Sequence, residues 1–107
     1  MAYCELNQIE TAVFAFKKAL DINPNSADTH FWLAVSYSLD SKNDRLAENE
    51  FIKTIKIDPD HLDARFKLFS LYVKNNEVGK AMQQLQEILI IDPGNKMAQD
   101  LLEKKEK

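Results

Sequence analysis

Apolar residues recur at spacings of three and four along most of the chain, which is the pattern of an amphipathic helix. The clearest examples are two series: Ala12, Phe16, Ala19 and Leu20, then Phe31, Ala34, Val35 and Leu39. Proline and asparagine positions interrupt the pattern. The interrupted apolar pattern therefore predicts an all-helical fold with helices near residues 10–22, 27–40, 44–57, 61–75, 79–91 and 96–105.

The chain repeats itself at the interval of its prolines. Pro24, Pro59 and Pro93 are separated by 35 and then 34 residues. The residues at matching distances before them are Ala12, Ala47 and Ala81 at twelve, Phe16, Phe51 and Leu85 at eight, and Ala19, Thr54 and Ile88 at five. Leu33 and Tyr37 follow Pro24 at the distances at which Leu68 and Tyr72 follow Pro59. Each interval therefore predicts two helices.

The breaks between helices also have a regular chemistry. Each proline follows a helix that it cannot continue, because it lacks a backbone N–H and its ring clashes with the preceding turn. Ser26 and Asp60 then stand where a side chain could cap the next helix. Asn7, Asn43 and Asn76 lie between the two helices of successive repeats, and asparagine tolerates the left-handed conformation that ends many helices. We expect a turn at each of the three.

Composition excludes several classes of protein. The chain has 107 residues, of which 45% are hydrophobic and 29% charged, so it is apolar enough to fold. Its net charge of −3 and its interspersed basic residues predict no binding to nucleic acid. The single Cys4 excludes an internal disulfide. No segment resembles a signal peptide or a membrane span, so we expect no membrane association, and a cytoplasmic location.

Catalytic and metal-binding patterns are missing from the sequence. His30 and His61 fall on or beside different predicted helices with no second ligand at helical spacing, so each is expected to have a capping or surface role. Acidic pairs such as Glu48 and Glu50 are typical of a solvated helix face. There is no phosphate-binding loop. We therefore predict a non-enzyme without a cofactor or metal.

The segments HFWLAVSY and LAENEFIKTIKIDP resemble the tetratricopeptide repeat family, with Ala34 at the small position usually held by glycine. The resemblance implies an α-solenoid of antiparallel helix-turn-helix repeats wound into a right-handed superhelix. It divides the chain into a partial first repeat (1–26), a second (27–61), a third (62–95) and a C-terminal capping helix (96–107). Pentatricopeptide repeats, which bind single-stranded RNA, are the alternative, but the proline register and the acidic net charge oppose them.

This chain departs from the family pattern at three places. The second repeat has one extra residue near SLDSKNDR, and Thr54 and Ile88 replace small alanines. The first repeat lacks about eight residues of its first helix, so that Tyr3 is in the register of Tyr37 and Tyr72. The exposed N-terminal edge predicts concentration-dependent self-association, and a structural self-assembly piece is the alternative function.

The resemblance also implies a concave groove that binds a peptide or protein segment. The matching positions are Asp28, Phe31, Trp32, Val35 and Leu39 on one helix, and Asp63, Phe66, Lys67, Ser70 and Lys74 on another. Two alternatives stay open: Phe31 and Trp32 could pack into the core, and Lys67 could form an ion pair with Asp63. Some family members grip EEVD-type tails with Lys, Asn and Arg side chains. Here Phe31, Trp32 and Val35 occupy those positions, which predicts no such binding.

Overall fold

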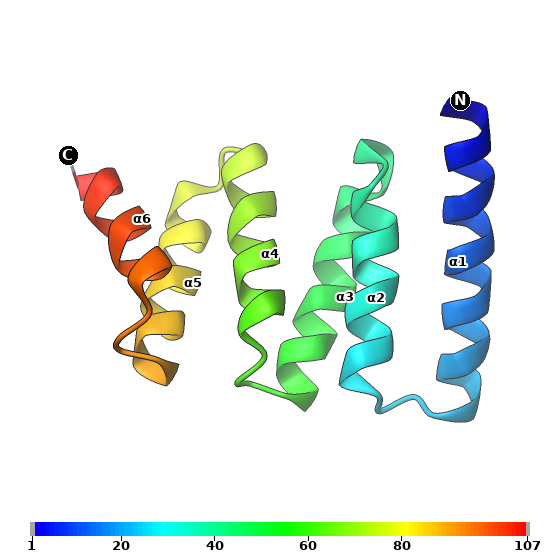
Figure 1. Cartoon of the computed structure of the whole chain (residues 1–107), viewed down its shortest axis with the longest axis horizontal. Helices are drawn as coiled ribbons and strands as arrows, with labels where there is room; N and C mark the ends of the chain where they lie inside the picture. The colour runs from blue at the N-terminus through cyan, green and yellow to red at the C-terminus, as the bar shows by residue number, and fades with distance from the viewer. Residues whose placement is uncertain (1, 107) are drawn as a thin grey trace. The chain divides into compact units, whose positions relative to one another are not determined.

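A computed structural model describes residues 2–106, and the side chains of residues 8–103. Its described part is all-helical: α1 (Ala2–Ile22), α2 (Ala27–Ser38), α3 (Asp44–Ile57), α4 (Leu62–Lys74), α5 (Val78–Ile91) and α6 (Lys96–Glu106), with a short 3-10 turn at Ser41–Asn43 (Figure 1). The helices form two compact units, one ending at Pro59 and one beginning at Asp60. None of the described helices combines the length and hydropathy that a membrane crossing requires.

α1 begins earlier than the sequence pattern predicts. The pattern placed a turn at Asn7 and a helix start near residue 10, but one continuous helix runs from Ala2 to Ile22. This prediction is wrong because asparagine weakens a helix interior by only a few tenths of a kcal/mol, and neither proline nor glycine occurs before Pro24. Cys4 and the predicted register of Tyr3 lie outside the described side chains.

Side chains after the prolines cap the helices that follow. Ser26 Oγ accepts a hydrogen bond from the Thr29 backbone N–H at 3.2 Å, as predicted for the start of α2. At α4 the N-cap is His61, whose Nδ1 accepts from the Ala64 N–H at 3.1 Å, so the prediction of an Asp60 cap is wrong. The capping role expected of His61 is confirmed.

The connection between α2 and α3 differs from the one between α4 and α5. In the second unit Asn76 has φ 61, the left-handed conformation predicted for it. The Glu77 N–H donates to the Tyr72 carbonyl at 2.7 Å and the Asn76 N–H to the Val73 carbonyl at 3.1 Å, which is the Schellman arrangement of a helix end. In the first unit residues 39–43 form a longer connection with a 3-10 turn, and Asn43 has φ −104, so it is not left-handed.

The core of the first unit lies between α2 and α3. Ala34 of α2 and Ala47, Phe51 and Thr54 of α3 are completely buried, and the small alanines allow close approach of the two helices. Thr54 is accommodated because its hydroxyl donates to the Glu50 carbonyl at 2.9 Å. α1 packs against α2, where Lys17 lies over the Tyr37 ring. The repeated positions on α3 are therefore core positions, whereas Ala12, Phe16 and Ala19 on α1 are half-buried or exposed.

The second unit has a core of its own. Leu85 and Ile88 of α5 and Ala98 of α6 are completely buried. The partly buried side chains packed against them are Leu62, Phe66, Phe69, Met82, Leu89, Leu101 and Leu102. Ile88 fills a position where the repeat pattern expects a small residue, so here a large aliphatic side chain supplies the buried volume.

Candidate functional site

α2 has one buried sector and one more exposed sector. Leu33, Ala34 and Tyr37 are buried. On the other sector Val35 is half-buried, whereas Trp32 is 52% exposed and Leu39 is 66% exposed. Large exposed apolar side chains on and just after one helix are costly to hydrate and mark candidate interaction surfaces. We call Trp32, Val35 and Leu39 the α2 surface.

Phe31 does not belong to this surface in the first unit. It is only 6% exposed, and its ring lies 5.8 Å from the Phe51 ring of α3, measured between centroids. This burial corrects the expectation that Phe31 would be available to a partner, and the core-packing alternative holds for this residue. Its ring also makes an edge-on contact with Trp32 at 5.0 Å, so it restricts the orientation of the exposed indole.

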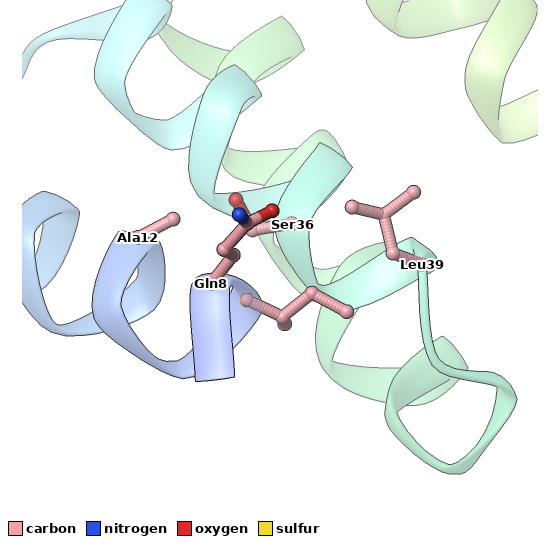
Figure 2. Close-up of a pocket in the computed structure, with 5 residues that line it drawn as sticks. Gln8, Ala12, Ser36 and Leu39 are labelled. Carbon is pink, nitrogen blue, oxygen red and sulfur yellow. The ribbon is translucent and has the colours of Figure 1, made fainter. Parts of the chain in front are cut away.

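A recess of about 380 Å³ lies between α1 and α2, next to the α2 surface. Gln8, Ile9 and Ala12 of α1, Ser36 of α2 and the α2 C-cap residue Leu39 line it (Figure 2). The Ser36 hydroxyl donates a hydrogen bond to the Trp32 carbonyl at 3.0 Å. The other polar side chain that lines the recess is the amide of Gln8 on α1. Sequence reasoning missed this recess because it assigned Gln8 to a turn region and not to α1.

α4 carries the second group of predicted site residues. Phe66 is half-buried and packs against the core of the second unit. Lys67, Ser70 and Lys74 are exposed, as is Asp63. Among the described side chains no ion pair joins Lys67 to Asp63, so the Lys67 ammonium group is not held by that neighbour. This surface is more polar and more basic than the α2 surface.

Both histidines are engaged in structural hydrogen bonds. His30 is buried and bonds to Glu50 and to the Pro24 carbonyl, while His61 caps α4. Within residues 8–103, no three His, Cys, Asp or Glu side chains come together as a metal site would require. The described part therefore presents exposed apolar side chains on α2 in the first unit and exposed lysines on α4 in the second.

Two models of known protein families match this chain. A family model described as TPR repeat matches residues 1–40, and one described as tetratricopeptide repeat matches residues 38–105. The chain belongs to the tetratricopeptide repeat family. Its helices are those of an α-solenoid of helix-turn-helix repeats, and the family is in general a non-catalytic scaffold for protein interactions.

A curated relative of this tetratricopeptide repeat chain is Superkiller protein 3 of Saccharomyces cerevisiae. It is 27% identical over 84 residues, which cover 78% of this chain and 6% of that protein. The chain therefore spans a small fraction of the length of that relative.

Solved tetratricopeptide repeat structures show the same fold. The first TPR of Spaghetti (RPAP3), bound to the HSP90 peptide SRMEEVD, has a TM-score of 0.78 at 17% identity over 96% of this chain and 81% of that chain. YrrB, described as a TPR protein with an unusual peptide-binding site, has a TM-score of 0.75 at 21% identity over 92% of this chain and 50% of that chain.

Proposed function

We propose that this tetratricopeptide repeat chain binds a peptide or protein segment through the α2 surface and the recess beside it. The observation that best supports this proposal is that Trp32 of α2 and Leu39 at its C-terminal end are exposed beside the recess. A partner side chain that fills the recess would remove apolar area from water, at about 25 cal/mol for each Å². Phe31 supports this role indirectly, because its edge contact orients the indole of Trp32.

α4, in the second unit, carries a separate polar surface that we propose as a contact for a partner in its own right. Lys67 offers a cation to an acidic group of a partner and Ser70 offers a hydroxyl, while Lys74 is exposed on the same helix and Phe66 is half-buried. The proposed partner is a protein or peptide, since a net charge of −3 disfavours nucleic acid and acidic lipid surfaces. The proposed role involves no catalysis, cofactor or metal.

Two structures that share this fold, the RPAP3 domain with its HSP90 peptide and YrrB with its unusual peptide-binding site, are peptide-binding proteins. An EEVD-type tail is nevertheless not the ligand that we propose here. Phe31 is buried, and Trp32 and Val35 present apolar surface where a carboxylate clamp needs lysine or asparagine. We infer that the segment bound at the α2 surface is apolar or aromatic at its centre.

The test is a selection of random displayed peptides on the full chain, followed by calorimetry of the recovered peptides. Val35→Glu places a charge in the α2 surface and should weaken binding at least about tenfold, which is about 1.4 kcal/mol. Val78→Glu is the matched control, because Val78 is an exposed valine on α5, outside the proposed surface. The peptide SRMEEVD serves as a negative control and should not bind at micromolar concentration.

Two results would contradict the proposal. If Val35→Glu unfolds the chain while Val78→Glu does not, Val35 is a core residue and the assignment of the α2 surface fails. If both variants bind the recovered peptides as tightly as the original chain, the peptides dock elsewhere. Circular dichroism of each variant separates the first result from a true loss of binding.

A second candidate function is self-assembly through α1. Ala47, Phe51 and Thr54 of α3 are completely buried, whereas Ala12, Phe16 and Ala19 hold the same repeat positions on α1 and remain half-buried or exposed. Gln8, Thr11, Ala12 and Ala15 border a shallow depression there, which we call the open face of α1. A second copy of the chain that covers this face would bury surface that the repeat pattern normally keeps from water.

A further inference from the structure

The open face of α1 continues into the recess beside the α2 surface. Gln8 and Ala12 line both hollows, one of about 380 Å³ against α2 and one of about 360 Å³ over α1. Ala15 lines the second hollow, and Ala19 and Ile22 continue the same helix face at spacings of four and three. From Gln8 to Ile22 this face extends over about 21 Å, at about 1.5 Å per residue. The two hollows therefore form one trough along α1.

The positions that lie open on α1 are covered on the two helices that match it in the repeat. On α3 and α5 the residues twelve, eight and five before the proline are completely buried. α3 packs against α2, the helix before it, and α5 packs against α4, the helix before it. On α1 the same places hold Ala12, Phe16 and Ala19, which are half-buried or exposed. In both matching cases the cover is therefore a helix.

α2 and α4 show which side chains such a covering helix buries. Each buries a leucine and, four residues later, a tyrosine: Leu33 and Tyr37 on α2, and Leu68 and Tyr72 on α4. On α2 the residue after the leucine is Ala34, which is completely buried and allows close approach to α3. A helix that covers α1 in the same way therefore carries a leucine, a small residue directly after it and an aromatic residue four positions after the leucine.

Ala15 distinguishes α1 from α3 and α5. The residue nine before the proline is Glu50 on α3, and its Oε1 lies 2.7 Å from Nδ1 of His30 on α2. On α5 it is Gln84, whose Oε1 accepts from Nη1 of Arg65 on α4 at 3.2 Å. His30 and Arg65 each stand three residues before the leucine of their helix. A polar side chain at that place would lose its partner against the methyl group of Ala15, so the helix that covers α1 needs an apolar residue there.

An extended segment suits the trough less well than a helix. Ala12, Ala15 and Ala19 offer no hydrogen-bonding side chains, and the backbone groups inside α1 are paired within the helix. An extended segment buried against them would leave its own N–H and C=O groups unpaired, whereas a helix pairs its own. Neither α2 nor α4 of a second copy meets the apolar requirement, because each carries a polar side chain opposite Ala15.

We propose that the trough binds an amphipathic helix of a partner protein, with an apolar residue, a leucine, a small residue and an aromatic residue at positions i, i+3, i+4 and i+7. This inference rests on the proposed function, because the trough includes the recess beside the α2 surface, and it adds the conformation and the pattern of the partner. The partner helix and a second copy of the chain compete for the open face of α1. Binding of the helix therefore opposes self-association.

The probe is a synthetic peptide with the sequence of residues 26–40, in which His30→Leu supplies the apolar residue and Trp32→Lys and Val35→Lys increase solubility. A free helix of this length is marginal in water, so the peptide should gain helical circular dichroism when the full chain binds it. The matched peptide keeps His30 and should bind at least about tenfold more weakly in calorimetry, the size expected for one buried polar group without a partner. Ala15→Gln in the chain supplies the amide found at Gln84 and should reverse this preference.

Three results would overturn the proposal: no binding of the leucine peptide at high micromolar concentration, equal affinity of both peptides, or binding without a gain of helix. Light scattering adds a fourth. If the leucine peptide leaves the mass of a self-associated chain unchanged, a second copy covers the trough instead. The proposed function is judged separately by the displayed peptides. If these lose affinity with Val35→Glu but bind without becoming helical, the proposed function stands and this inference fails.

Discussion

At the scale of single residues, Asn76 gives the sharpest test of the local structure. Its φ of 61 is left-handed, and the Schellman bonds from Asn76 and Glu77 depend on that conformation. Asn76→Gly should leave stability unchanged or raise it, because glycine adopts this conformation without strain. Asn76→Val should cost about 1–2 kcal/mol, since a β-branched side chain clashes there. Thermal unfolding measures both. Asn75→Val is the control at φ −97, and an equal loss at both positions would contradict the argument.

The same residues show what a sequence can predict about turns. The sequence pattern assigns Asn7, Asn43 and Asn76 to the same inter-helix position, but Asn7 lies inside α1, and only Asn76 is left-handed among the three. The outcome depends on how many residues join the helices, since residues 39–43 adopt a 3-10 turn where residues 75–77 adopt a Schellman ending. Residue preferences could not predict the N-cap at His61 either, because aspartate is among the preferred N-cap residues and therefore favours Asp60.

At the scale of helices, the matched positions of α1 and α3 allow a quantitative comparison. Phe51 is completely buried, so Phe51→Ala should destabilise the first unit by about 3–5 kcal/mol. Phe16 holds the same repeat position on α1 but is only half-buried, so Phe16→Ala should cost less than about 2 kcal/mol. Urea unfolding at low micromolar concentration measures both. Equal losses would show that the open face of α1 is covered in solution even at that concentration.

Periodicity predicted five of the six helices closely, because their ends coincide with prolines and turns that act locally. It did not predict which of two neighbouring aromatic residues of α2 is exposed. Phe31 and Trp32 are adjacent and similarly apolar, and only the position of Phe51 on α3 decides that the first is core and the second is surface. The recess beside Leu39 depends likewise on the extra turns of α1, which no local signal indicated.

At the scale of the whole molecule, each unit has its own core, and the open face of α1 leaves the first unit with uncovered apolar surface. Phe14 at 63% exposure adds to the apolar area on this helix. Contact between two copies is an economical way to cover such a surface, because a symmetric dimer doubles every favourable contact. We therefore expect reversible self-association of the full chain.

Light scattering over a range of concentrations tests this expectation. The mass should rise from 12.3 kDa toward twice that value as the concentration reaches the high micromolar range. Ala15→Glu places a charge on the open face of α1 and should shift the dimerisation midpoint to at least about tenfold higher concentration, because a charge buried without a partner is costly. Ile90→Glu, at an exposed position of α5, should leave the midpoint unchanged. A mass of 12.3 kDa at every concentration would rule out self-assembly through α1 and leave peptide binding at the α2 surface as the remaining candidate function.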